Sequence, residues 1–223
     1  MNTMFSTLLQ LPLFQGISQE DFTHILGKVK LHFSKHKAGE VIIEENSPCT
    51  GLVFLLQGEV AGITTSNDGS FSIIEKFQKS YLIEPQALFG MDTFYKATYT
   101  AHTDANTVSI DKSFIMKDLF KYEIFRINYM NYVCNRTQCY QKKLWMNAPD
   151  SVEVKIKQFI LSHIERPEGE KILRIKMEDL AHYIDDTRLN VSKALNSLQE
   201  KGVLQLNRKE VVVPNGLMLL EQV

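Results

Sequence analysis

The sequence has few cysteines and no long apolar run. Its 223 residues include only three cysteines, an odd number that does not suggest a disulfide framework. No apolar run approaches the roughly 18 residues that a membrane-spanning helix needs. The N-terminus, Met-Asn-Thr-Met-Phe, lacks the cationic start and apolar segment of a secretory signal. We therefore expect a cytoplasmic protein with no membrane partner.

The motifs of common catalytic and cofactor sites are also missing. The sequence contains no nucleophile elbow, P-loop or dinucleotide fingerprint. Cys134 and Cys139 lie five apart on an expected helix and diverge by about 140°, so they cannot easily chelate a metal. With Cys49, we interpret them as buried structural thiols. His32 and His36 are four apart but lie in an expected strand and turn without a carboxylate pattern. We expect no enzyme, metal or cofactor.

The segment from Ile175 to Val213 has the pattern of a winged helix-turn-helix. A first short helix is predicted by an apolar face at helical spacing: Met177, Leu180, Ala181 and Ile184. After a polar break, Thr187 is placed to cap a second helix, which Gly202 ends. The buried side of this helix is predicted to hold Val191, Ala194, Leu195 and Leu198. Residues 203–206 and 211–213 predict a hairpin around the polar turn 207–210.

Cations concentrate in this segment. Five lie between Thr187 and Lys209 against one acid, in a chain whose net charge is −1. Such a stripe is typical of phosphate contact. The alternative is a plain helical hairpin with an ordinary solvated face. We expect DNA contacts from the outward face of the second helix and from the hairpin turn: Thr187, Arg188, Leu189, Asn190, Ser192, Lys193, Asn196, Arg208 and Lys209.

The region before this segment predicts a small β-structure. An apolar stretch and a helix that starts at Ser18 come first. From Leu31 to about Ile115, short β-rich runs alternate with turn signals such as Asn67-Asp68-Gly69-Ser70. The predicted strands are 41–43, 52–56, 60–65, 71–74, 98–103 and 107–110. Their near-regular spacing favours a small antiparallel barrel or roll.

A long helix is predicted from Phe114 to about Ala148. Five of its residues step by three and four, the spacing of a two-stranded coiled-coil seam: Met130, Val133, Thr137, Tyr140 and Leu144. We predict that this seam forms a homodimer interface. The alternative is packing on the chain's own roll, for which Ile124 and Ile127 on a neighbouring face are available. Residues 148–151 break the helix and mark a linker.

The order of roll, long helix, break and winged helix resembles the Crp/Fnr family of bacterial transcription regulators. The resemblance covers nearly the whole chain. It rests on Leu11-Pro12-Leu13-Phe14 with Gly16-Ile17-Ser18, Lys37-Ala38-Gly39-Glu40-Val41-Ile42, Gly58-Glu59-Val60, Met177 to Ile184, Thr187-Arg188 and Val191-Ser192-Lys193. It implies a homodimer paired through the long helix, with two recognition helices in successive major grooves of double-stranded DNA. It also implies RNA polymerase as a partner.

The chain departs from the family pattern where cyclic nucleotides bind. Members that bind them use a Glu for the ribose and an Arg for the cyclic phosphate. Pro85 and Tyr95 occupy these two positions here, so the carboxylate and the bidentate fork are missing. The resemblance implies that cAMP does not bind. An unknown small-molecule effector in the same pocket, or none, fits equally. The candidate pocket residues are Glu84, Gln86, Tyr95, Lys96, Cys139 and Tyr140.

Together these features predict an α+β chain. Residues 1–115 form an N-terminal antiparallel β-roll of the double-stranded β-helix or jelly-roll type, as the effector domain. Residues 116–148 form the long dimerisation helix, and residues 149–223 the C-terminal winged helix-turn-helix. The predicted function is a sequence-specific transcription regulator. The alternative is a ligand-binding or protein-interaction module whose C-terminal domain does not bind DNA.

Overall fold

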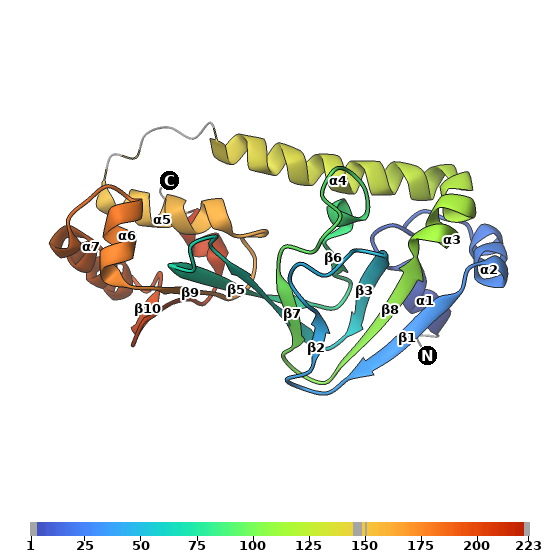
Figure 1. The fold of residues 1–223 in the computed structure, drawn as a ribbon, viewed down its shortest axis with the longest axis horizontal. Coiled ribbons are helices and arrows are strands. Elements are labelled where there is room, and N and C mark those ends of the chain that lie inside the picture. Colours follow the sequence, from blue (N-terminus) through green and yellow to red (C-terminus); the bar gives the residue numbers. More distant parts are fainter. Residues whose placement is uncertain (1–3, 145–148, 150, 221–223) are drawn as a thin grey trace. The chain divides into compact units, whose positions relative to one another are not determined.

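The structure, a computed structural model, describes residues 4–144, 149 and 151–220. The α+β class expected from the sequence is confirmed. The chain divides into two units (Figure 1). The N-terminal unit comprises residues 1–61 and 77–139, and the C-terminal unit comprises residues 62–76 and 140–223. A hairpin from the middle of the chain therefore belongs to the C-terminal unit.

The N-terminal unit is an antiparallel roll. One sheet has the strand order β1-β8-β3-β6, and β2 and β7 are neighbours in the second sheet. The strands up to residue 111 are β1 (Leu31–His36), β2 (Val41–Ile43), β3 (Gly51–Gln57), β4 (Glu59–Thr65), β5 (Phe71–Gln78), β6 (Leu82–Ile83), β7 (Thr98–Ala101) and β8 (Ala105–Asp111). The end of β4 and most of β5 belong to the C-terminal unit. All six strands predicted from the sequence are present. The two-residue β6 was not predicted, because so short a run has no periodicity to read.

Helices and aromatic rings close the core of the roll. Helix α1 (Met4–Leu9) precedes α2 (Gln19–Lys28), and Ser18 caps α2 by accepting a hydrogen bond from the Asp21 N–H at 3.1 Å. The ring of Phe14 lies 5.4 Å from that of Phe22 and 5.2 Å from that of Phe125, measured between centroids. These rings bury large apolar areas. They therefore anchor α2, which carries Phe22, and the later helix that carries Phe125 to the core of the roll.

The prediction of a single helix from Phe114 to Ala148 is wrong for the first residues, which form separate shorter elements. The structure has α3 (Lys112–Lys117), a 3₁₀ turn η2 (Leu119–Lys121) and then α4 (Glu123–Leu144). Asp118 leaves the helical conformation, with φ −120° and ψ −49°, and the next residue, Leu119, is fully buried. Burial of Leu119 in the roll therefore accompanies the break. Ala148 and Asp150 of the predicted linker lie outside the described residues.

One face of α4 packs on the roll, but not the face suggested by the sequence. Phe125 and Tyr129 are buried, and Tyr132 and Val133 pack partly buried on the same core. Ile124 and Ile127, the residues expected there, are each 41% exposed, so that expectation is wrong. Steps of four and three residues place the aromatic side chains on one stripe of the helix, and the roll buries this larger area instead.

The C-terminal unit contains the predicted helix-turn-helix. Its elements are α5 (Val152–His163), β9 (Lys171–Ile175), α6 (Met177–Tyr183), α7 (Arg188–Glu200), β10 (Gln205–Asn207), β11 (Glu210–Val213) and the 3₁₀ turn η3 (Gly216–Leu219). Its core joins apolar residues of all three helices with those of β9 and β11. Strand β9 was not predicted. It pairs antiparallel with β5 from Phe71↔Ile175 to Glu75↔Lys171, and on its other side with β11.

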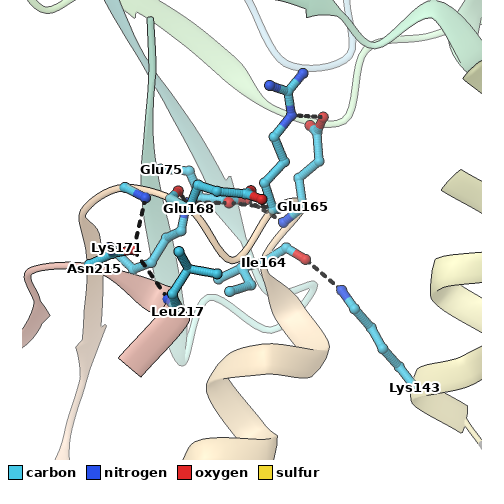
Figure 2. A network of polar contacts seen from close by, with 10 residues as sticks. Glu75, Lys143, Ile164, Glu165, Glu168, Lys171, Asn215 and Leu217 are labelled. Carbon is cyan, nitrogen blue, oxygen red and sulfur yellow. Dashed lines mark hydrogen bonds and ion pairs between the residues drawn. The ribbon is translucent and has the colours of Figure 1, made fainter. Parts of the chain in front are cut away.

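Polar contacts hold the β5 hairpin in this unit (Figure 2). A Glu75 carboxylate oxygen lies 3.0 Å from the Lys171 ammonium, and the other accepts the Glu165 backbone N–H at 2.7 Å. The Lys171 ammonium also donates to the Glu168 carbonyl at 2.8 Å. From the end of α4, the Lys143 ammonium donates to the Ile164 carbonyl at 2.6 Å. Charged groups of three sequence regions therefore meet around the segment that follows α5.

In the part of the chain that the structure describes, no helix combines the length and the apolar character needed to cross a membrane.

Candidate nucleic-acid interface and effector pocket

The turn between α6 and α7 is fixed by side chains. Thr187 caps α7 as predicted, because its hydroxyl accepts the Asn190 backbone N–H at 3.2 Å. The Asp186 carboxylate accepts the Thr187 N–H and the Asn190 side-chain amide, each at 2.9 Å. Lys155 of α5 reaches the same carboxylate at 3.2 Å. The hydrogen bond from Asn190, then that from Thr187, lowers the pKa of Asp186 below its usual range. The start of α7 is therefore set by a charged anchor.

Helix α7 divides into the two faces predicted from its periodicity. Its buried residues are the four expected ones: Val191, Ala194, Leu195 and Leu198. Arg188, Leu189, Lys193 and Asn196 are exposed, and Ser192 is half-buried. Leu189 is 64% exposed, which places a large apolar side chain on the outward face beside Arg188. The Arg188 guanidinium makes a long contact, 3.7 Å, with the Glu178 carboxylate.

The wing is tighter than the sequence suggested. Asn207 and Glu210, expected in the turn, form a cross-strand pair, so the loop consists of Arg208 and Lys209 alone. Lys209, the second residue of this loop, has φ +64°, in the left-handed region. The Leu206 N–H donates to the side-chain oxygen of Gln199 at 2.8 Å, which ties the wing to α7. The loop therefore presents its two cations at a defined position next to the helix.

The cations near the wing include two that the sequence analysis missed, Arg174 and Lys176. A hollow of about 360 Å³ separates the wing from the start of α7. Its lining includes Lys176, Arg188 and Lys209. A neighbouring hollow is lined by Arg174 and Arg208 as well. Arg174 pairs with Glu210 at 2.8 Å. Arg174 and Lys176 are two residues apart just before α6, and residues at this spacing lie on the same face of a strand. The sequence could have indicated them only if β9 had been predicted.

The candidate effector pocket contains a buried carboxylate. Glu84 is 3% exposed, and its oxygens accept hydrogen bonds from the backbone N–H groups of Lys96 and Ala97 and from the Tyr99 hydroxyl. Pro85 begins the 3₁₀ turn η1 (Pro85–Leu88) that follows. Lys96 was expected to offer its charge to this pocket. Its ammonium instead pairs with Asp92, and its side chain is 60% exposed.

The other pocket candidates lie in different environments. Tyr95 is buried, and burial is the main cause that raises its pKa. Gln86 is half-buried, and within the described part its side-chain oxygen has no hydrogen-bond partner. Cys139 and Tyr140 are exposed on α4, and Tyr140 belongs to the C-terminal unit. The structure therefore brings Glu84, Tyr95 and the Lys96 backbone together.

The three thiols are not all buried, contrary to the sequence-based interpretation. Cys49 is 5% exposed, and its Sγ lies 3.3 Å from the Gly51 carbonyl oxygen. Burial raises the pKa of this thiol, as expected for a structural cysteine. Cys134 and Cys139 are exposed. The interpretation was wrong for these two because the roll packs against the aromatic stripe of α4, which includes neither of them.

Two family models match the chain in succession. Residues 33–122 match the cyclic nucleotide-binding domain, and residues 154–221 match the Crp-like helix-turn-helix domain. No curated protein matches the chain in sequence.

Solved structures share the fold at low identity. The Thermus thermophilus catabolite activator protein is 17% identical, with a TM-score of 0.50, over 94% of this chain and 97% of that one. The sensor domain of the transcriptional regulator DNR from Pseudomonas aeruginosa is 15% identical, with a TM-score of 0.51, over 64% and 92%. The N-terminal domain of a transcriptional regulator from Streptomyces coelicolor A3(2) is 20% identical, with a TM-score of 0.50, over 65% and 99%.

These findings decide between the two functions considered from the sequence. The Crp-like match covers the elements α5 to η3, so the C-terminal domain is a DNA-binding one. The alternative of a module with a purely structural C-terminal domain is set aside. With the cyclic nucleotide-binding domain before it, the chain belongs to the Crp/Fnr family of DNA-binding transcription regulators, which are not enzymes.

Proposed function

We propose that this regulator binds a palindromic DNA site as a homodimer and that it does not respond to cAMP. In this proposal the N-terminal roll is the effector domain, α4 (Glu123–Leu144) pairs the two copies, and the C-terminal domain from residue 149 binds DNA. The observation that carries the proposal is the outward face of α7, where Arg188, Leu189 and Lys193 are exposed next to a cationic wing. An exposed Leu between two exposed cations suits a surface that meets base edges and phosphates together.

Arg188, Leu189 and Lys193 occupy the positions at which the best-known half-site of the family is read by Arg, Glu and Arg. The Arg188 guanidinium suits the O6 and N7 atoms of guanine, which it can contact in bidentate fashion. Leu189 cannot accept a hydrogen bond from cytosine, but it can contact a thymine methyl group. Lys193 keeps the charge without the planar fork, so it reads guanine less selectively or contacts phosphate. We expect a consensus that differs at the base pair facing Leu189.

The remaining residues of the interface have supporting roles. Thr187 and Asn190 are committed to the turn by the hydrogen bonds that cap α7, so we assign them to positioning the helix. Ser192, Asn196, Arg208 and Lys209 suit phosphate or sugar contacts, to which Arg174 and Lys176 add charge from the same hollows.

Selection from random duplexes tests the register of α7. Wild type and Leu189→Glu should each enrich a palindrome whose half-sites lie about 10–10.5 bp apart, centre to centre. The two consensus sequences should differ at one base pair per half-site, because Glu accepts from cytosine and Leu does not. Gln199→Glu adds a carboxylate to α7 at an exposed position outside the proposed reading set and keeps the oxygen that accepts the Leu206 N–H, so it serves as the control and should leave the consensus unchanged. The same consensus from wild type and Leu189→Glu would contradict the register.

The free face of α4 supports the dimer. Met130 and Thr137 of the predicted seam are exposed, and Ile127 and Cys134 continue their stripe at steps of three and four residues. Val133 is half-buried against its own roll, so less of its apolar surface is free to contact a second copy. Tyr140 is exposed at the edge of the stripe, and the side chain of Leu144 lies outside the described residues. We propose that two copies pair along Ile127, Met130, Cys134 and Thr137.

Mild oxidation tests this pairing directly. Cys134 lies on the proposed seam, whereas Cys139 points about 140° away from it on the same helix. Oxidation with copper phenanthroline should produce a covalent dimer in wild type and in Cys139→Ser, and none in Cys134→Ser. All three proteins should have the same mass by light scattering under reducing conditions. A covalent dimer that requires Cys139, or a monomer in solution, would contradict the proposed seam.

The effector part of the proposal rests on Pro85 and Tyr95. Neither residue can replace a ribose-binding carboxylate or a phosphate-binding guanidinium. Isothermal titration with cAMP should therefore show no binding at micromolar concentrations. Measurable micromolar affinity would overturn this part and leave the DNA-reading part untouched.

A further inference from the structure

Glu84 combines burial with an uncommon backbone conformation. Its side chain is almost wholly buried, at 3% exposure, in the segment between β6 and η1. Its φ of +33° and ψ of +56° place it in the left-handed region, which residues other than glycine seldom adopt. A buried carboxylate is costly unless hydrogen bonds or charges compensate it. Other interactions must therefore compensate for both the burial and the backbone conformation of Glu84.

The reason is a set of converging donors. The Lys96 N–H reaches one carboxylate oxygen at 2.9 Å, and the Ala97 N–H reaches the other at 3.1 Å. The Tyr99 hydroxyl donates to the second oxygen as well, at 3.1 Å. Ala97 and Tyr99 are themselves buried. Two consecutive backbone N–H groups and a hydroxyl that point to one place form a concave site for an oxyanion.

This donor set does not depend on the Glu84 backbone. Residues 96–99 lie about a dozen positions further along the chain, and two of the three donors are backbone groups that any sequence would supply. We propose that residues 96–99 form an oxyanion-binding cradle in the roll and that the Glu84 carboxylate is its internal occupant. The protein thereby keeps the cradle filled without a diffusible anion and closes it to anionic effectors.

The groups around the cradle leave the Glu84 carboxylate as the one negative charge among the buried side chains of Glu84, Tyr95 and Cys49. The Tyr95 hydroxyl and the Cys49 thiol are buried nearby, and burial raises the pKa of both, so both stay neutral. The Lys96 ammonium is engaged by Asp92. A carboxylate held by amide and hydroxyl donors matches a small carboxylate such as acetate in charge and in donor requirements.

If the Glu84 side chain is removed, an added anion such as acetate should bind in the cradle in its place. In Glu84→Gly the backbone keeps its left-handed conformation without strain, and the cradle becomes empty. The thermal midpoint of this variant should fall below that of wild type. Sodium acetate should then raise it along a saturable curve, and sodium chloride at the same ionic strength should not. The wild type should respond to the two salts alike.

Glu84→Gln is the matched control. Its side chain has nearly the same volume and still occupies the cradle, although its amide nitrogen cannot accept from the donors on one side. Its midpoint should therefore also fall, but acetate should act on it no more than chloride does, because the side chain keeps acetate out. In ¹H–¹⁵N spectra of Glu84→Gly, the amide signals of Lys96 and Ala97 should shift and saturate with acetate, and in Glu84→Gln they should not. If Glu84→Gly does not fold in chloride, its refolding yield should increase in acetate.

Equal behaviour of Glu84→Gly in acetate and chloride, in melting, in the two amide signals and in refolding, would overturn the proposal and make Glu84 a structural anchor only. The proposal does not depend on how α7 reads DNA. The test uses neither DNA nor cAMP, so it fails or succeeds separately from the proposed function.

Discussion

The carboxylate of Glu75 lies 3.0 Å from the ammonium of Lys171, and both side chains are buried. The two residues face each other in the register of β5 and β9, almost a hundred residues apart in the sequence. A buried charge without its partner is strongly destabilising, so this pair penalises any other register of the two strands. We therefore expect this pair to favour the observed register, in which a hairpin from the middle of the chain joins the C-terminal unit.

Removing one member of this pair should therefore be costly. Lys171→Met should lower the free energy of unfolding by about 3–5 kcal/mol, because it leaves the Glu75 carboxylate buried and unpaired. The double variant Glu75→Gln, Lys171→Met should recover much of the loss, since the Gln oxygen can still accept the Glu165 N–H. Urea unfolding followed by circular dichroism measures both.

Lys76→Met, in the partner strand β5, provides the control for the loss of a paired lysine. Lys76 pairs with Glu170 at 2.7 Å, and both side chains are partly exposed. Its removal should cost about 1 kcal/mol or less. Equal losses for Lys76→Met and Lys171→Met would show that burial of the Glu75–Lys171 pair has no special effect.

Substitutions at two glycines of the roll distinguish the cost of a left-handed backbone from the cost of a steric clash. Gly58 and Gly39 both have positive φ, +88° and +89°. A Cβ at Gly58 would lie 2.4 Å from the Asp104 carbonyl oxygen, whereas a Cβ at Gly39 meets nothing within 4 Å. Gly39→Ala should cost about 1–2 kcal/mol for the left-handed backbone alone. Gly58→Ala should cost clearly more or prevent folding. Similar thermal midpoints for the two variants would contradict this close approach.

Local patterns were sufficient for the parts of the fold that depend on them. The faces of α7, the Thr187 cap and the end at Gly202 follow from helical periodicity and from the chemistry of helix ends, and the structure confirms all three. The strands of the roll follow in the same way from short β-rich runs between turns.

The features that the sequence did not reveal depend on contacts between distant residues. No local signal shows that Lys171 to Ile175 will pair with β5, because the partner strand lies almost a hundred residues earlier. The aromatic stripe and the isoleucines of α4 are both apolar, and only the shape of the roll decides which of them it buries. Glu84 reads as an ordinary polar residue before a proline until its donors at 96–99 are known.

Acid should weaken the helix-turn-helix through Asp186. Its folded-state pKa lies below its ordinary value of 3.8, so its carboxylate stabilises the fold at pH above that value. This contribution is lost as the pH falls through the lowered folded-state pKa. The difference in urea midpoint between wild type and Asp186→Asn should therefore be largest above about pH 5 and shrink toward pH 3. Curves that stay parallel down to pH 3 would exclude this role.

The two cationic parts of the interface should differ in how they depend on salt and on sequence. Arg188 is exposed at the start of α7, where we propose that its guanidinium faces a base edge, and Lys209 lies in the loop of the wing, where we propose that it faces the DNA backbone. Arg188→Ala should cost about 1–3 kcal/mol of binding to the selected site and relax the preference at one base pair. Lys209→Ala should weaken selected and random duplexes by the same factor. It should also reduce the slope of log K against log salt by about one, because one phosphate contact is lost. Fluorescence anisotropy on both duplexes between low and moderate salt measures these quantities. If Lys209→Ala changes the base preference and Arg188→Ala changes only the salt slope, then the wing reads bases and α7 contacts the backbone, the reverse of the arrangement proposed.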